Sequence, residues 1–320
     1  DTAELYAGGF SEEIVGKVIK DCRKSIFVAT KFSPGRSTYR EVLESAEGSL
    51  RRLDTDYIDL YQVHWPNPTV PFYDTIRALD KLRSEGKVRY IGVSNFSLEQ
   101  LEELCSLTSI DSVQSEYNLF DRTAESNILP YCQEKGLTFI AYSPLDQGNP
   151  ISNSEGLDLL KFLSDKYNKT VSELVLNWLV SHSPVVAIPK ASSTEHTRRN
   201  AYSADFKISD SDVGRIAAAF TTKVELVSVD RIRVITGGQG DREVYKTIAE
   251  AVENSLGLIP SPVDLASSMT SATILKPVRV IKTTDTTGRY DYDLVEGRIR
   301  YWAWVIANES KLPIPVISRN

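Results

Sequence analysis

The chain has 320 residues, of which 41% are hydrophobic and 25% charged, and its net charge is -6. This composition is typical of a globular protein long enough for one large domain or two smaller ones. It predicts no basic surface for nucleic acid, and no apolar run reaches the roughly 18 residues of a membrane-spanning helix. The three cysteines are too far apart for a disulfide framework or a zinc site, so we expect no metal and a reducing, cytoplasmic setting.

Helix-like and strand-like segments alternate from residue 12 to about 220. Helices are predicted at 12–24, 39–53, 72–86, from 97, at 127–136, from 170 to about 182, from about 194, and at 208–220. Strands are predicted at 25–32, 57–65, 88–96, 112–119, 137–145 and 185–190. The strands are continuous apolar runs, as in parallel strands buried on both faces. Repeated strand–helix units of about 30 residues predict an α/β fold with a parallel sheet.

Two α/β architectures fit this repeat, an open doubly wound sheet and a closed (β/α)8 barrel. Polar residues end almost every predicted strand: Lys31, His64, Ser94, Asn95, Gln114, Tyr142, Ser143 and Lys190. An open sheet concentrates its ligand contacts at one switch point, whereas a barrel gathers them from every strand at one rim. The distribution favours the barrel. The chain has neither a G-x-G-x-x-G nor a Walker-type phosphate motif.

The pattern changes near residue 222, where short strands begin to mix with short helices. We therefore predict two domains, a barrel over residues 1–222 and a small α+β domain over residues 223–320. The only methionine is Met269, the chain begins at Asp1, and no basic-then-apolar leader is present. We therefore expect the chain to be part of a longer protein.

Four residues of the first domain suit the reduction of a carbonyl group. The phenol of Tyr6 is a weak acid, but a buried ammonium such as Lys31 favours the phenolate and lowers the pKa of the phenol. Asp1 can hold the lysine, and His64 can hydrogen-bond the carbonyl oxygen that receives the proton. Each residue alone also fits simple packing or a charge at the barrel rim. Their placement on successive strand ends favours the catalytic interpretation.

The motifs DTAELYAGGFSEEIVGK, ATKF, VHWP, GKVRYIGVSNF, VQSEYN, AYSPL and IPKASSTEHTRRN occur in this order over about 200 residues. In sequence and spacing they closely resemble the aldo-keto reductases. The resemblance implies a (β/α)8 TIM barrel that binds NAD(P)H without a Rossmann fold. It also implies that Tyr6 is the general acid/base, that Lys31 and Asp1 tune it, and that His64 orients the carbonyl.

The resemblance also implies a cofactor site. Ser94, Asn95 and Gln114 would hold the carboxamide, and Tyr142 would stack on the nicotinamide ring. The remaining positions, for the pyrophosphate and the adenosine end, are Ser143, Leu145, Lys190, Ser192, His196 and Asn200. Without the family, Ser94 and Asn95 also fit a helix cap, and Lys190 fits a solvated lysine. We expect NADP because Lys190 matches a family position near the 2′-phosphate of the adenosine. NAD is the alternative, because His196 stands where relatives often have arginine.

The chain departs from the family in two further places. Ala7 stands where a glycine usually follows the tyrosine. The family's first strand, first helix and most of its second strand precede the Asp-Thr-Ala motif and are not in this sequence. We therefore expect an N-terminally truncated barrel, and the activity of the chain as given is in question because six complete strands cannot close one.

The second domain resembles the ParB/sulfiredoxin-like fold in its segments VELVSVDRIRV, LKPVRVIKTTD and YDLVEGRIRYWA. Glu296, Gly297 and Arg300 stand in the family's phosphate-binding motif at a helix start. The alternative is that Glu296 only pairs with Arg300 across one helical turn. We expect a nucleotide at this domain, and specific DNA binding is not expected because no helix-turn-helix follows.

The sequence thus predicts a cytoplasmic, NAD(P)H-dependent oxidoreductase that reduces small aldehydes or ketones to alcohols, with Tyr6 as general acid. Trp65, Phe10, Phe72 and Phe120 are candidates for an apolar substrate mouth, although packing explains them nearly as well. Two other classes stay open, a nicotinamide-nucleotide sensor without fast turnover and a regulatory nucleotide-binding protein that acts through its second domain.

Overall fold

The computed structural model describes residues 1–148, 154–235, 245–269 and 276–318. The chain forms two compact units, one of residues 1–149 and 163–213 and the other of residues 150–162 and 214–320. Two of the boundaries between these units fall inside helices, namely α6 (Ser154–Tyr167) and α9 (Asp210–Ala219). The boundary predicted from the sequence, at residue 222, lies instead between α9 and strand β7 (Val224–Val227). A domain boundary at that position stays a prediction.

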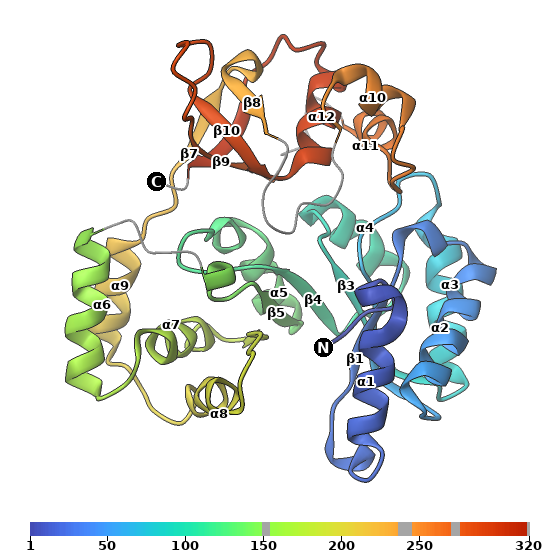
Figure 1. The fold of residues 1–320 in the computed structure, drawn as a ribbon. Helices are drawn as coiled ribbons and strands as arrows, with labels where there is room; N and C mark the ends of the chain where they lie inside the picture. The colour runs from blue at the N-terminus through green and yellow to red at the C-terminus, as the bar shows by residue number, and fades with distance from the viewer. Residues whose placement is uncertain (149–153, 236–244, 270–275, 319–320) are drawn as a thin grey trace. The chain divides into compact units, whose positions relative to one another are not determined.

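The first unit is built on six parallel strands, each paired with the next in chain order (Figure 1). They are β1 (Ala29–Phe32), β2 (Ile58–Val63), β3 (Val88–Ser94), β4 (Ser112–Glu116), β5 (Thr138–Tyr142) and β6 (Val185–Ala187). All residues of β1 and β2 are buried, as the continuous apolar runs predict. The parallel α/β architecture is therefore confirmed.

The predicted barrel has eight strands, whereas the described part of the chain has six in its parallel sheet. Within these residues no pairing joins β1 to β6. The outer edge of β1 is covered by the first residues of the chain, because the Thr2 and Glu4 amides donate to the carbonyls of Ala29 and Lys31 at 2.9 and 3.0 Å. The sheet as described is thus a six-stranded portion of the predicted architecture rather than a closed ring.

Helices follow most of the strands. In the first unit they are α1 (Phe10–Ile19), α2 (Tyr39–Leu53), α3 (Phe72–Ser84), α4 (Leu98–Leu107), α5 (Ile128–Lys135), α7 (Val171–Val180) and α8 (Thr194–Tyr202). Ser97 and Thr170 begin α4 and α7 with capping boxes, in which each side chain accepts a hydrogen bond from the third helical amide. No helix in the described part of the chain is long and apolar enough to cross a membrane.

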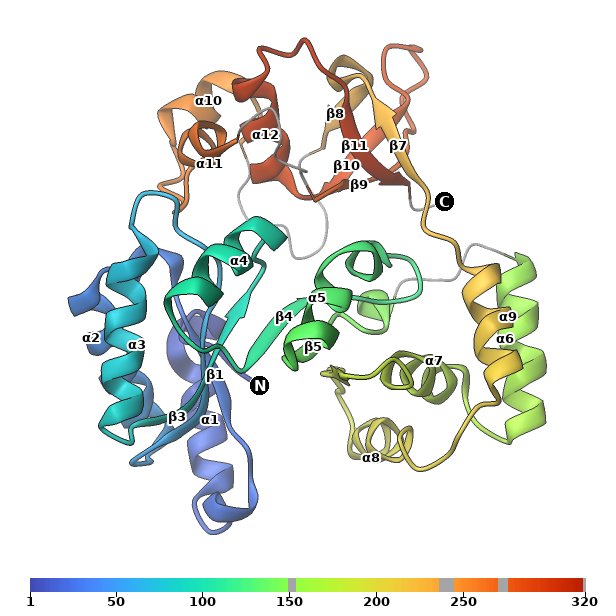
Figure 2. The same ribbon diagram turned by 180° about the vertical axis from the view of Figure 1, so that it is seen from behind.

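The second unit contains a five-stranded mixed sheet with the order β7-β11-β9-β10-β8 (Figure 2). Its elements are β7 (Val224–Val227), β8 (Ile232–Val234), α10 (Ile248–Glu253), α11 (Pro262–Ser268), β9 (Val278–Lys282), β10 (Tyr292–Glu296), α12 (Arg298–Ala307) and β11 (Ile314–Ser318). Strands and short helices mix as the sequence predicts, and Tyr301, Trp302 and Val305 of α12 join the core beside Val278 and Val280 of β9.

Gly92 in β3 gives a test of how tightly the first unit is packed. A Cβ atom at this position would lie 2.4 Å from Ser112 Oγ and 3.0 Å from Gln62 Cγ. We expect Gly92→Ala to lower the free energy of unfolding by about 1–3 kcal/mol, the usual effect of overpacking a core. Urea denaturation measures it. Ser112→Ala removes the nearest atom, so the double variant should regain part of the loss, whereas strictly additive effects would contradict the clash.

Candidate active site

Lys31 is the most deeply buried charged side chain of the predicted catalytic set. It lies in β1 with no exposed surface, and its Nζ contacts Asp1 Oδ1 at 2.5 Å and the Thr2 carbonyl oxygen at 3.0 Å. Burial lowers the pKa of Lys31 to about 7. The carboxylate of Asp1 acts in the opposite sense, because it stabilises the charged amine. The ammonium therefore depends on Asp1 to stay charged near neutral pH.

The second oxygen of Asp1 is held by two buried amides. Gln114 Nε2 donates to Asp1 Oδ2 at 2.9 Å, and Gln62 Nε2 lies 3.5 Å from the same oxygen. The Asp1 side chain is 13% exposed. Strands β1, β2 and β4 thus converge on one carboxylate, which fixes its orientation toward Lys31.

Tyr6 lies at the start of a short 3-10 turn (Tyr6–Gly9) and is 39% exposed. Its ring meets the His64 ring edge-on at a centroid distance of 5.5 Å, and Lys31 Nζ is 5.2 Å from the centre of the Tyr6 ring. Ala7, which follows, has φ of +51°, a left-handed conformation that favours glycine. The turn leaves the tyrosine beside the buried lysine and open to solvent.

His64 follows β2 and is buried. Its ring stacks on Trp65 at a centroid distance of 3.9 Å, and its carbonyl oxygen accepts a hydrogen bond from Asn95 Nδ2 at 3.1 Å. These contacts fix the imidazole at the end of β2, next to Tyr6. The structure therefore brings together Asp1, Tyr6, Lys31 and His64, which come from three separate segments of the sequence.

Four of the predicted cofactor contacts form a connected group at the ends of β3, β4 and β5. Asn95 donates to Ser94 Oγ at 3.0 Å, and its Oδ1 accepts from Tyr142 OH at 2.9 Å. The amide N–H of Asn95 donates to the carbonyl of Gln114 at 3.0 Å. Asn95 has φ of +64°, a left-handed conformation that asparagine tolerates. These bonds position the polar groups beside the predicted catalytic residues.

Ser143 and Leu145 lie in a tight turn directly after β5. The carbonyl of Ser143 accepts hydrogen bonds from the Asp146 amide at 2.9 Å and from Asn118 Nδ2 at 3.2 Å. The carbonyl of Leu145 accepts one from the Gly148 amide at 2.9 Å. The turn is therefore built by the protein's own hydrogen bonds.

Lys190, Ser192, His196 and Asn200 lie after β6 and on α8. The first three are exposed. Ser193 caps α8 by accepting from the His196 amide at 3.2 Å. Within the described ranges, neither the Lys190 ammonium nor the His196 ring has a hydrogen bond or ion pair. These residues form a polar surface that is largely open to solvent, in contrast to the buried Lys31 and His64.

Gln62 was not predicted from the sequence, although it lies directly against Asp1. The available signal was its position two residues before His64, because alternate residues of a strand share a face. A polar residue on that face, within an apolar run, also departs from the pattern of its strand.

In the second unit, each charged member of the predicted phosphate site has a protein partner. Glu296 Oε2 accepts from Arg279 Nη1 at 2.9 Å, and Arg300 Nη1 donates to the carbonyls of Lys276 and Pro277 at 2.8 and 3.1 Å. Gly297 precedes α12 with φ of +88°, and a Cβ there would lie 2.9 Å from Arg300 Nη2. The arginine therefore folds back over the helix start.

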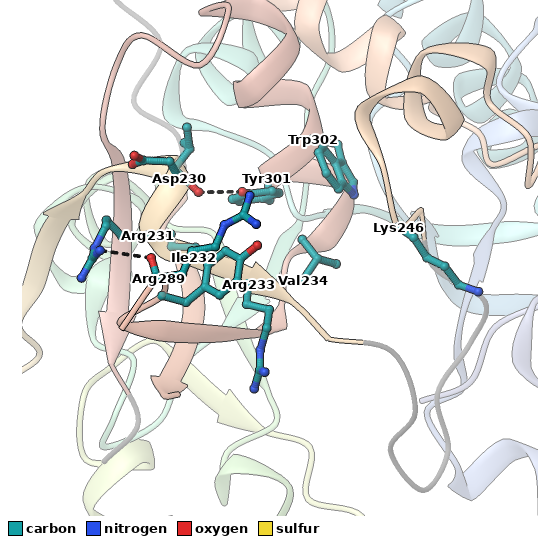
Figure 3. A pocket seen from close by; sticks show the side chains of 11 residues that line it. Asp230, Arg231, Ile232, Arg233, Val234, Lys246, Arg289, Tyr301 and Trp302 are labelled. Atoms are coloured by element: carbon teal, nitrogen blue, oxygen red, sulfur yellow. Dashed lines mark hydrogen bonds between the residues drawn. The ribbon is translucent and has the colours of Figure 1, made fainter. Parts of the chain in front are cut away.

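A separate pocket of about 560 Å³ lies in the same unit (Figure 3). Residues 229–234, Lys246, residues 289–290 and residues 301–302 of α12 line it. Of its arginines, Arg231 and Arg233 are engaged bidentately by Asp291 and Asp293 at 2.6–2.9 Å. Lys246 lies well apart from both (Figure 3). Two of the pocket's four cations are thus neutralised by nearby carboxylates, and Lys246 is separated from these two.

Comparison with known proteins decides the family of the first unit. A model of the aldo/keto reductase family matches residues 1–220. The chain belongs to the aldo/keto reductase family. It is 32% identical over 238 residues to methylglyoxal reductase YeaE of Escherichia coli, covering 72% of this chain and 83% of the relative. It is 37% identical over 221 residues to glyoxal reductase of Bacillus subtilis, covering 68% and 77%.

A solved structure supports the same family. The aldo/keto reductase from Klebsiella pneumoniae in complex with NADP and acetate superimposes with a TM-score of 0.65 at 35% identity, covering 69% of this chain and 79% of that one. Family membership confirms the prediction of an NAD(P)H-dependent oxidoreductase that reduces carbonyl groups. The ParB-like character of residues 223–320, the expected truncation and the cytoplasmic setting stay predictions.

Proposed function

We propose that Tyr6 is the general acid of this aldo/keto reductase, with Lys31 and Asp1 as its tuning pair and His64 as the residue that orients the substrate carbonyl. The observation that carries the proposal is a buried ammonium held at 2.5 Å by Asp1 and 5.2 Å from the Tyr6 ring. A nearby positive charge favours the phenolate and so lowers the pKa of the phenol. Tyr6 can then give its proton to a carbonyl oxygen near neutral pH.

Bound NADPH would supply the hydride for the carbonyl carbon. The chain's own residues supply the proton and the geometry. Tyr6 is 39% exposed, so its hydroxyl can meet a substrate, whereas Lys31 is closed off from water. The negative charge left on Tyr6 after proton transfer is stabilised by the Lys31 ammonium, whose own burial reduces the screening of its charge by water. His64, fixed by Trp65 and Asn95, donates to or accepts from the same oxygen.

For the cofactor, Ser94, Asn95 and Gln114 are proposed to hold the carboxamide and Tyr142 to stack on the ring. The support is their connected hydrogen-bond group beside Tyr6 and Lys31. The pyrophosphate and adenosine contacts are proposed at the turn after β5, on the segment before α8 and on α8 itself, namely Ser143, Leu145, Lys190, Ser192, His196 and Asn200.

The proposed substrates are small aldehydes, including dicarbonyls of the kind named for the relatives, methylglyoxal and glyoxal. Trp65, which is 38% exposed and stacked on His64, and Phe10, which is 52% exposed, are the candidates for an apolar mouth. Phe72 stacks on Phe96 at 5.4 Å, which favours a packing role for that residue.

Tyr6→Phe tests the proposed acid. We expect it to lower kcat for methylglyoxal reduction by about 10²–10⁴-fold, because general acid catalysis is lost while the ring is kept. Steady-state NADPH oxidation measures the rate. Tyr73→Phe, an exposed tyrosine on α3, is the matched control and should keep full activity. A Tyr6→Phe rate within about twofold of the parent would remove Tyr6 from the mechanism. NADPH binding without any turnover in the parent would favour the sensor.

Lys190→Met tests the preference for NADPH. If Lys190 contacts the extra phosphate of NADPH, the change should raise the KM for NADPH about tenfold and leave the KM for NADH unchanged, since a charge-assisted hydrogen bond contributes about 1.5–3 kcal/mol. Lys207→Met, an exposed lysine after α8, is the control. Equal effects on the two cofactors would show that Lys190 does not read the phosphate.

A second proposal concerns the unit that contains residues 223–320, namely the ParB-like resemblance and a nucleotide at Glu296, Gly297 and Arg300. The glycine at the start of α12 and the adjacent arginine support it. The test is calorimetric titration of the full chain, saturated with NADP⁺, with nucleoside di- and triphosphates. Weak binding that Arg300→Ala lowers by at least ~1.5 kcal/mol is expected. If the heat of nucleotide binding is unchanged by Arg300→Ala, or if no binding heat is seen, Arg300 only holds the carbonyls of residues 276 and 277.

A further inference from the structure

Gln62 lies beside the Lys31–Asp1 pair, with its Nε2 at 3.5 Å from Asp1 Oδ2. We propose that Gln62 is a positioning residue, which holds the Asp1 carboxylate when Gln114 turns to the cofactor and thereby keeps Lys31 charged beside Tyr6. The inference rests on the proposed function, because it takes the roles of Lys31 and Gln114 from it.

The strand register places Gln62 at the centre of the site. It pairs with Lys31 of β1 on one side and with Gly92 of β3 on the other, and it is completely buried. The glycine makes room for it, because a Cβ at Gly92 would come within 3.0 Å of Gln62 Cγ. The fold therefore contains a place for this long polar side chain in the middle of an otherwise apolar strand.

Packing alone does not account for a glutamine there. A buried amide is favourable only when its polar atoms are hydrogen-bonded. Within the described residues Oε1 of Gln62 has no hydrogen-bond partner, and Nε2 has only Asp1 Oδ2, at 3.5 Å. An apolar side chain of similar length would fill the space at lower cost. The single polar contact that the side chain makes points to Asp1.

Gln62 and Gln114 both direct their side-chain Nε2 at the same oxygen, Asp1 Oδ2. Gln114 is the closer of the two, at 2.9 Å compared with 3.5 Å for Gln62. If Gln114 turned to a bound carboxamide, this oxygen would lose its nearer donor in a largely buried site. Gln62 Nε2 is only about 0.5 Å beyond ordinary hydrogen-bond length, so a small shift lets it take over.

The consequence for Lys31 is electrostatic. The ionisable groups around its ammonium are the carboxylate and the amino group of Asp1, the Tyr6 phenol and the His64 ring, while the nearby Glu4 carboxylate is turned to the Ser33 amide at 2.6 Å. Burial and the charge of Lys31 lower the pKa of that amino group. Asp1 is thus the carboxylate that opposes the effect of burial. If it rotates away, Lys31 loses its proton at a lower pH, and the phenolate of Tyr6 loses its stabilising charge.

The experiment follows the titration of Lys31 directly. The full chain is labelled at lysine Cε with ¹³C, and the Lys31 resonance is assigned by its loss in Lys31→Met. In Gln62→Leu saturated with NADP⁺, the pKa of Lys31 should fall by at least about half a unit, with a smaller fall in the cofactor-free protein, where Gln114 still holds Asp1. The alkaline limb of kcat for aldehyde reduction should move to lower pH by the same amount. Gln62→Glu adds a negative charge and should shift the pKa of Lys31 upward.

Ser112→Ala is the matched control. Ser112 is buried beside Gly92, as Gln62 is, but does not contact Asp1, so its variant should leave the Lys31 titration and the activity unchanged. If Gln62→Leu disturbs folding, Gln62→Met supplies an unbranched substitute of similar length. The proposal is overturned if the pKa of Lys31 is the same in Gln62→Leu or Gln62→Met as in the parent protein. It is also overturned if the substitution changes this pKa equally with and without NADP⁺. Because it needs no turnover, this result is independent of the Tyr6→Phe assay.

Discussion

The proposed active site depends on one buried contact, the 2.5 Å approach of Lys31 Nζ to the Asp1 carboxylate. A lysine without exposed surface tends to lose its proton, and an aspartate in the same place tends to gain one. Each group therefore keeps its charge only while the other is near. The remaining contacts fix this pair in place, namely the Thr2 carbonyl on the lysine and the two glutamine amides on the aspartate. In the proposed mechanism, Tyr6 is a good acid only while that charge is in place.

The backbone around the pair is held in conformations that few residues adopt freely. Ala7, Asn95 and Ser143 all have φ between +49° and +64°, and each lies at or next to a predicted site residue. Asn95 is supported by bonds to Tyr142, Ser94 and the His64 carbonyl, and Ser143 by Asn118. Ala7 has no side-chain hydrogen bond to offset the cost, so its conformation is imposed by the turn that presents Tyr6.

Much of the first unit could be predicted because its signals are local. Apolar runs gave the six parallel strands, and serine or threonine with a following glutamine or glutamate gave the starts of α4 and α7. The residues at strand ends converge because parallel strands share one end, so Lys31, His64 and Asn95 could be grouped without coordinates. The position of Gln62 two residues before His64 placed it on the same face, but its contact with Asp1 and the space left by Gly92 of the neighbouring strand depend on the fold. The partners of Glu296 and Arg300 were equally hidden, because they lie on β9 and just before it, about 20 residues away.

The two ends of the proposed cofactor site differ in burial, and the difference follows from what each must do. Near Tyr6 the polar groups are buried, because charges act on a reacting bond most strongly where water is excluded. Lys190, which precedes α8, and His196 on α8 are exposed and without hydrogen bonds or ion pairs of their side chains in the described ranges. A phosphate there has only to be recognised, and exposed cations can do so without the cost of burying an unpaired charge when the site is empty. In the proposed mechanism, cofactor specificity depends on exposed residues and reactivity toward the carbonyl depends on buried ones. Substitutions can therefore change one of these properties without changing the other.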